Sequence, residues 1–146
     1  MVSARVITPL MLLVSFSLAG CSQSNSEDRA FIVDTCAPVY EVDWTNFELD
    51  SYDDLAAEYS TLKNKASNYG DEAKEVSAEV AELVAELDAA GDKFQNETRA
   101  GLADFDLDTT DLDELKREND LRTEEFWAER DRISGALNEI CAPYFE

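Results

Sequence analysis

Histidine is absent from this 146-residue chain, so the commonest general base and the commonest side-chain metal ligand are both missing. Basic residues are also scarce, because only 12 Lys and Arg stand against 33 Asp and Glu. Phosphate contacts depend on Lys and Arg, so this balance argues against a DNA-binding or RNA-binding protein. Proline and glycine number only three and five, which excludes a low-complexity linker. A single small acidic domain remains as the expectation.

Sequence motifs of enzymes are missing as well. The chain has no glycine-rich phosphate loop, no nucleophile elbow and no cluster of residues at metal-ligand spacing. Carboxylates are so numerous that no pair stands out as a general acid and base. We therefore expect a protein that is not an enzyme, and an enzyme whose site leaves no trace in the sequence is the last of the alternatives.

The first 20 residues have the pattern of an export signal. Arg5 is their only charged residue, and an apolar run of about 13 residues follows it over positions 6–18. A membrane-spanning helix needs about 20 apolar residues, so this run is too short to span a bilayer comfortably. The run ends in Leu18, Ala19, Gly20 and Cys21.

This ending resembles the lipobox of bacterial lipoprotein precursors, in which an aliphatic residue and two small residues precede a cysteine. The resemblance covers only residues 1–21. It implies that residues 1–20 are a signal peptide cleaved before Cys21, and that Cys21 carries a diacylglyceryl group. Two acyl chains hold a protein stably on a membrane. The implied location is the extracytoplasmic face of the cell membrane.

The part that follows the signal is strongly acidic. Residues 21–146 carry all charged residues except Arg5, that is 11 basic and 33 acidic, for a formal charge of −22. Residues 21–30 are small and polar after the cysteine, so they are predicted to form a flexible tether for a domain over residues 31–146. Because the domain repels anionic lipid head groups, its contact with the membrane is expected to be through the lipid alone.

The cysteine count agrees with this interpretation. With Cys21 assigned to lipid, Cys36 and Cys141 remain near the two ends of the domain, in a compartment that permits disulfides. We predict a disulfide between them. Two cysteines without histidine do not make a usual zinc site, and without a CxxC motif catalytic redox chemistry is not expected.

The body of the domain shows helical periodicity, and no strand-type alternation persists after position 50. Helices are predicted over about 51–69, 71–103 and 110–141, with Gly91 as a weak point or a break in the second. Their apolar stripes comprise Tyr52, Leu55, Tyr59, Leu62, Ala66 and Tyr69; Val76, Val80, Leu83, Val84, Leu87, Phe94, Thr98, Leu102 and Phe105; and Leu112, Leu115, Phe126, Ile133, Leu137 and Ile140. The predicted fold is therefore all-α, a disulfide-closed three-helix antiparallel bundle with coiled-coil-like packing. Residues 31–49 are predicted to be mostly irregular, with a short helix before Cys36.

Alternating aspartates between the second and third predicted helices are the sharpest local feature. Asp104, Asp106, Asp108, Asp111 and Asp113 are candidate oxygen ligands for a hard cation such as calcium. An EF-hand loop beginning at Asp104 lacks the turn glycine, because Thr109 stands at its sixth position, and it lacks the final glutamate, because Leu115 stands at its twelfth. The simpler interpretation is an inter-helix loop with an acidic first helical turn.

Candidate partner-binding residues lie on the third predicted helix. Asn119 and Arg122 interrupt its apolar stripe, which suggests either a register-setting pair or a place where the helices open for a partner. Trp127 lies off the stripe, where it either packs on the lead-in segment or serves as an interface residue. The second helix carries an acidic row that is either solvated or faces a basic partner: Asp71, Glu75, Glu79, Glu82 and Glu86.

The sequence thus favours a membrane-anchored, non-catalytic helical interaction module. A lipoprotein that binds divalent cations through residues 104–114 is the main alternative, and an enzyme without a visible site follows it.

Overall fold

The structure is a computed structural model that describes residues 22–46, 48–103, 105–106 and 111–146. Every regular element in these ranges is helical, which confirms the all-α prediction. Four α-helices are present rather than three, namely α1 (Ser22–Cys36), α2 (Asp50–Lys65), α3 (Asp71–Ala103) and α4 (Leu112–Cys141). Short 3-10 helices cover Trp44–Asn46, Ala66–Asn68 and Ala142–Tyr144.

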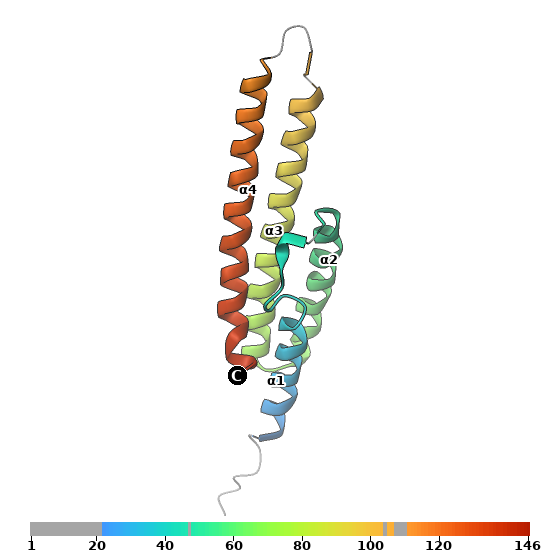
Figure 1. Cartoon of the computed structure of the whole chain (residues 1–146). Helices are drawn as coiled ribbons and strands as arrows, with labels where there is room; N and C mark the ends of the chain where they lie inside the picture. The colour runs from blue at the N-terminus through green and yellow to red at the C-terminus, as the bar shows by residue number, and fades with distance from the viewer. Residues whose placement is uncertain (1–21, 47, 104, 107–110) are drawn as a thin grey trace, which may run out of the picture.

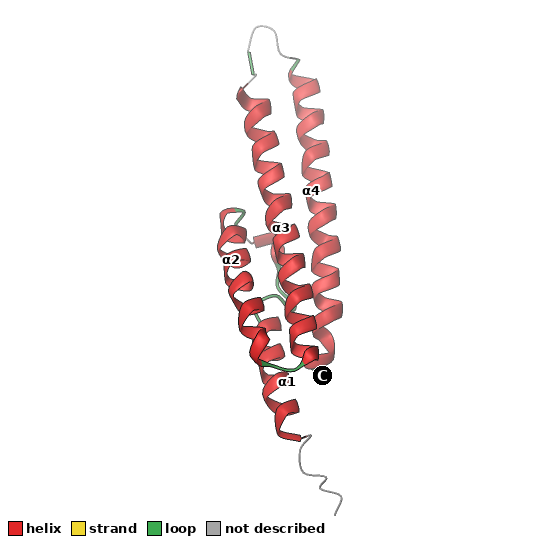
Figure 2. Ribbon diagram, turned by 180° about the vertical axis from the view of Figure 1, so that it is seen from behind, coloured by secondary structure: helices red, strands yellow, loops and turns green. Residues whose placement is uncertain are grey.

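The two long helices form a hairpin that is only partly covered. Figure 1 shows α3 and α4 side by side and antiparallel, with α2 along the lower half of α3 and α1 at the same lower end as the C-terminus. Seen from behind in Figure 2, the upper half of the hairpin extends well beyond α2. The molecule therefore has a lower end built of four helices and an upper end built of two.

The hydrophobic core fills the four-helix end. α1 contributes one face to it through Phe31, Ile32 and Cys36. The hydroxyl of buried Thr35 donates a hydrogen bond to the carbonyl oxygen of Phe31 at 2.9 Å. The other helices add apolar side chains at helical spacing, which are Tyr52, Tyr59 and Ala66; Ala73, Val76, Val80, Ala81, Val84 and Leu87; and Phe126, Ile133, Leu137 and Cys141. Burial of this apolar surface is the main favourable contribution to folding.

Gly91 marks where α2 begins to cover α3. The helix continues through Gly91, so there is no break at this position. A Cβ atom there would lie 3.0 Å from the ring of Tyr52 and 3.5 Å from Leu49, both near the start of α2. The glycine therefore serves a close helix approach, and this explains its place in an otherwise good helical sequence.

Residues 22–49 differ from the sequence prediction. α1 begins at Ser22, so the segment after Cys21 is helical where a flexible tether over 21–30 was expected. Tertiary contacts hold the later part of this helix: an Asp28 carboxylate oxygen accepts a hydrogen bond from the backbone N–H of Gly70 at 3.0 Å, and Phe31 stacks on Tyr69 with ring centroids 4.1 Å apart. After α1, Val39 and Trp44 are buried, which makes residues 37–46 part of the core's cover.

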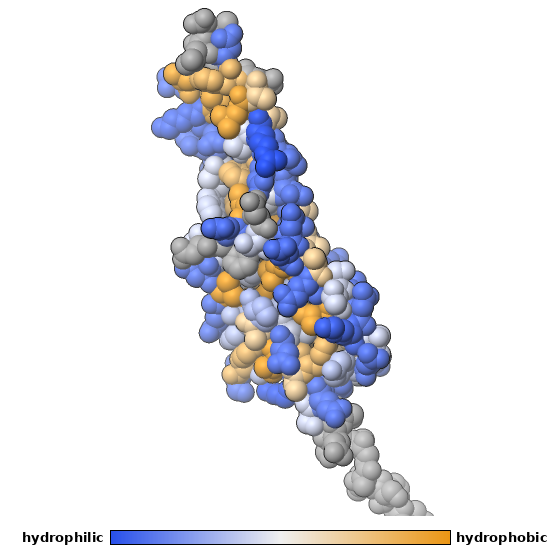
Figure 3. All heavy atoms as spheres, turned by 90° about the vertical axis from the view of Figure 1, so that its right-hand side faces the viewer, coloured by the Kyte–Doolittle hydropathy of each residue, from blue (hydrophilic) through white to orange (hydrophobic). Residues whose placement is uncertain are grey.

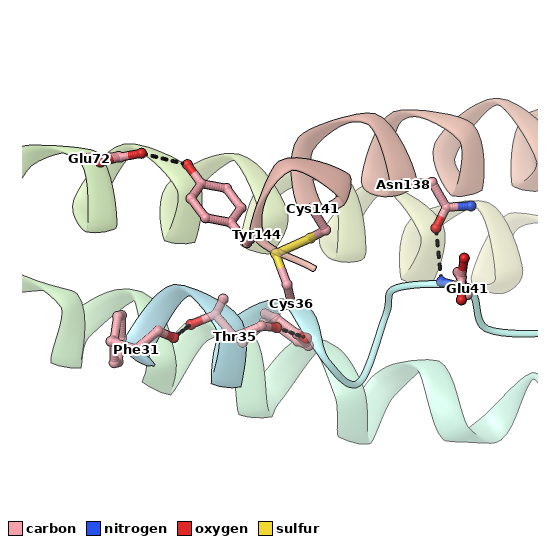
Figure 4. The surroundings of a disulfide bond; sticks show 9 residues. Phe31, Thr35, Cys36, Glu41, Glu72, Asn138, Cys141 and Tyr144 are labelled. Carbon is pink, nitrogen blue, oxygen red and sulfur yellow. Dashed lines mark hydrogen bonds between the residues drawn. A yellow bond between two sulfur atoms is a disulfide. The ribbon is translucent and has the colours of Figure 1, made fainter. Parts of the chain in front are cut away.

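The predicted disulfide between Cys36 and Cys141 is confirmed. It joins the end of α1 to the end of α4, with the Cα atoms 5.5 Å apart and both residues fully buried (Figure 4). Beside it, the Asn138 side-chain oxygen accepts the backbone N–H of Glu41 at 3.0 Å. Glu41 has a φ of 53°, so this bond holds a backbone conformation that side-chain-bearing residues rarely adopt.

The boundaries of the other helices lie close to those predicted. The range 71–103 coincides with α3, and α4 begins at Leu112 instead of position 110. The helix predicted over 51–69 is α2 followed by the 3-10 turn Ala66–Asn68. None of the helices in the described ranges is long and apolar enough to cross a membrane.

Candidate functional site

The core stops halfway along the hairpin. In α3 the last buried residue is Gly91, and in α4 the first is Phe126. No residue is fully buried in the described part of the hairpin beyond these two, which comprises residues 92–103 and 112–125. Phe94 and Phe126 stack across the two helices, with ring centroids 5.1 Å apart, and close the core at this level.

Beyond this aromatic pair the two helices enclose an open groove of about 350 Å³. We call it the hairpin groove, and its lining residues are Thr98, Gly101, Leu102, Leu112, Leu115, Lys116, Asn119 and Arg122. Leu102 and Leu112 are 64% and 60% exposed, which is unusual for two neighbouring leucines on facing helices. Figure 3 shows apolar atoms gathered near this end of the molecule.

Arg122 forms the inner wall of the groove. Its side chain crosses to α3 at Gly101, where a Cβ atom would lie only 3.1 Å from guanidinium Nη2. Arg122 also lines a second, smaller hollow of about 80 Å³ next to Phe94 and Phe126. The guanidinium therefore separates the groove from the end of the core.

Arg122 has no polar partner within the part of the chain that the structure describes. Its Nε is buried without a hydrogen bond, and so is the hydroxyl of Thr98 on the facing helix. Each of the other five arginines after Cys21 bonds a protein oxygen; Arg117, for example, lies 3.3 Å from Glu114. A buried donor without an acceptor costs about 1–3 kcal/mol, so these atoms favour a bound acceptor.

The three candidate partner-binding residues do not form one site. Asn119 and Arg122 both line the groove, and a partner-binding role for them stays a prediction. Trp127 lies elsewhere, with the Arg130 guanidinium carbon 4.0 Å from its ring centroid. The sequence did not identify Gly101 or Lys116 as groove residues, although the polar interruption at Asn119 and Arg122 was the available signal.

The acidic residues between α3 and α4 show one clear role. Asp111 is the N-cap of α4, and its side chain accepts the backbone N–H groups of Asp113 at 3.0 Å and Glu114 at 3.3 Å. This satisfies two of the free donors at the helix start. Asp104 and Asp108 lie outside the described residues, so a cation site using them stays a prediction. Among the described residues, including Asp106 and Asp113, no group of three or more potential ligands is placed to hold a metal.

The acidic row on α3 is partly engaged within the molecule. Glu86 lies 2.5 Å from the Arg132 guanidinium of α4, which also bonds Glu129 at 2.7 Å. Glu72, beside the row, accepts a hydrogen bond from the Tyr144 hydroxyl at 2.8 Å. Burial, together with this hydrogen bond, raises the pKa of Tyr144 to about 12. A basic partner for the rest of the row stays a prediction.

One carboxyl group is electrostatically unusual but lies outside the groove. Burial raises the pKa of Asp88 to about 6, and a hydrogen bond with Asp53 together with the charges of Asp53 and Asp92 adds to this. Asp88 sits between α3 and α2 and lines neither the groove nor the smaller hollow beside it. We interpret the pair as a consequence of packing acidic helices together.

Cys21, the predicted lipidation site, lies outside the described residues. The structure accounts for the other two cysteines through the disulfide. Comparison of the chain with protein-family models, with curated proteins and with solved structures found no match.

Proposed function

We propose that the chain is the precursor of a lipid-anchored extracytoplasmic lipoprotein whose helical domain is a non-catalytic interaction module of bundle type. The observation that carries the proposal is the sequence Leu18, Ala19, Gly20 and Cys21 directly after a short apolar run. The buried disulfide supports it, because such bonds persist in exported proteins and are rare in the cytosol.

The shape of the molecule agrees with an anchored module. α1 begins one residue after Cys21, at the lower end of the molecule in Figure 1, and the hairpin end lies at the opposite extreme. At about 1.5 Å per residue, the 33 residues of α3 extend about 50 Å. A lipid on Cys21 would therefore hold the four-helix end near the membrane and present the hairpin groove away from it.

The charge distribution favours a protein ligand over nucleic acid or lipid. The formal charge of −22 after the signal repels phosphates, so polyanions are poor ligands for the molecule as a whole. The groove offers an apolar floor with a few polar groups, which suits a protein segment. The proposed role is to present this groove at a fixed distance from the membrane.

Mass spectrometry of the protein purified from its native membrane tests the proposal. We expect an N-terminal peptide that begins at Cys21 and carries a diacylglyceryl modification. The Cys21→Ala variant should keep the uncleaved signal, because both lipidation and cleavage depend on this residue in lipoproteins. An unmodified Cys21, or cleavage at another position, would overturn the proposal.

A further inference from the structure

The hairpin groove lies between α3 and α4, beyond the level at which α2 covers α3. α2 covers α3 only as far as Gly91, because the first turn of α2 packs at that glycine. Residues 92–103 of α3, about 18 Å of helix, have no third helix beside them in the described structure. The hairpin still carries Leu102, Leu112 and Leu115 along the groove, so the groove is apolar, and none of the described helices covers it.

The charges that line the groove are opposite in sign to the net charge of the molecule. Among its described lining residues only Lys116 and Arg122 are ionisable, and both are basic. Neither forms an ion pair with a described residue, although the chain contains 33 carboxylates. A ligand that complements the groove therefore combines apolar side chains with a carboxylate, which arginine binds by charge-assisted hydrogen bonds.

A second copy of the chain does not provide that complement. If two copies paired through the same face, the interface would gather Lys116 and Arg122 of both copies, and no carboxylate among the described lining residues would complement them. The groove therefore favours a different protein as its occupant.

We propose that the hairpin groove binds an acidic amphipathic helix of a partner protein. The apolar face of that helix packs on Leu102, Leu112 and Leu115, where the described structure has no third helix. One of its carboxylates bonds the terminal guanidinium nitrogens of Arg122, which have no partner among the described residues. This is the helix-in-groove mode of peptide recognition, and the inference rests on the interaction role proposed above.

Synthetic helical peptides test the proposal directly. The probe is a fluorescent peptide of about 18 residues with leucines on one face and glutamates beside them, and the second probe has glutamine in place of each glutamate. The full mature chain is used as purified, in phosphatidylcholine nanodiscs if it is acylated and in buffer if it is not. We expect the glutamate peptide to bind at least about tenfold more tightly than the glutamine peptide in fluorescence anisotropy.

Variants of the protein identify the groove as the binding site. Arg122→Gln should weaken the glutamate peptide about tenfold and remove the preference between the two peptides, while the matched Arg117→Gln, on an exposed residue outside the groove, should change neither. Gly101→Ala should also weaken binding, because its methyl group displaces the guanidinium. Gly135→Ala is its control, because a Cβ there meets nothing within 4 Å. Melting curves of each variant confirm that the fold is kept.

Three results would overturn the proposal. The first is no binding of either peptide at about 1 mM. The second is equal affinity for the two peptides, or a preference that survives Arg122→Gln. The third is self-association of the protein in sedimentation that Arg122→Gln abolishes, which would assign the groove to a second copy. Because none of these measurements depends on acylation, failure here is distinguishable from failure of the lipid-anchor proposal.

Discussion

Removal of the disulfide between Cys36 and Cys141 tests how much of the stability comes from closing the chain. The two residues are 105 positions apart, so the bond encloses nearly all of the helical domain. In the chain-entropy model, closing a loop of this length restricts the unfolded state enough to stabilise the fold by about 4.8 kcal/mol. Small domains are stable by about 5–15 kcal/mol in total. The reduced protein is therefore expected to be marginally stable at 25 °C.

The acidic composition adds a salt dependence to this expectation. A crosslinked unfolded chain cannot expand fully, so its many carboxylates repel one another more strongly than in the reduced unfolded chain. Screening shortens the range of that repulsion from about 8 Å at physiological ionic strength to about 3 Å at 1 M salt. The stabilisation by the disulfide should therefore be larger at low salt than at high salt.

Urea unfolding followed by circular dichroism is the suitable assay, because urea leaves the ionic strength free to vary. The oxidised protein is compared with the same chain reduced in denaturant and refolded with reductant, so both forms keep the same atoms. The Cys36→Ala and Cys141→Ala double variant is a second comparison, with an added loss from two small cavities at fully buried positions. The oxidised form should also show a smaller m value, because its unfolded state exposes less surface.

A loss below about 1 kcal/mol on reduction would refute the loop-entropy reasoning. It would mean that the reduced unfolded chain is already compact, or that the native state is strained by the bond. A loss that does not change with salt would refute the electrostatic part alone.

Three further predictions concern single side chains. Because the pKa of Asp88 is raised from 3.8 to about 6, the folded state holds a proton there that the unfolded state has released between about pH 4 and 6. Stability is therefore lost as pH rises through that window. Asp88→Asn should stabilise the protein by about 1 kcal/mol at pH 7, after allowance for solvent screening, but have no effect at pH 3. Equal effects at both pH values in urea titrations would contradict this. Gly135→Ala should raise the free energy of unfolding by about 0.5–1 kcal/mol, because alanine has the higher helix propensity. Gly91→Ala should show no such increase, because its Cβ crowds the start of α2. Thermal melts that rank the two variants equally would argue against this packing. Tyr59 is fully buried, and its hydroxyl donates a hydrogen bond to a backbone carbonyl of α1 at 2.6 Å. Tyr59→Phe should therefore lower the free energy of unfolding by about 1–2 kcal/mol. An unchanged midpoint in chemical denaturation would count against that bond.

The sequence alone determined the helical class and most helix boundaries. Apolar residues recur at three- and four-residue spacing over long stretches with few glycines and prolines, and this signal is local. The range 71–103 was obtained in this way and coincides with α3. The pairing of Cys36 with Cys141 also followed from the sequence, because assigning Cys21 to lipid left only two cysteines.

Tertiary contacts decided the start of the domain. The residues after Cys21 are small and polar, and their composition is that of a tether. α1 nevertheless begins at Ser22, and its later residues pack against distant parts of the chain, as Phe31 does on Tyr69 and Asp28 on Gly70. Such contacts between positions about 40 residues apart leave no local pattern, so sequence periodicity does not reveal them.

The groove shows the same division between sequence and structure. The sequence showed that Asn119 and Arg122 interrupt an apolar stripe, because this is a matter of spacing on one helix. Only the tertiary structure showed that α2 begins level with Gly91, that the Arg122 guanidinium packs against Gly101, and that Arg122 Nε is buried without a hydrogen bond. These facts depend on where separate helices stop relative to one another, which is set by packing and not by any single helix.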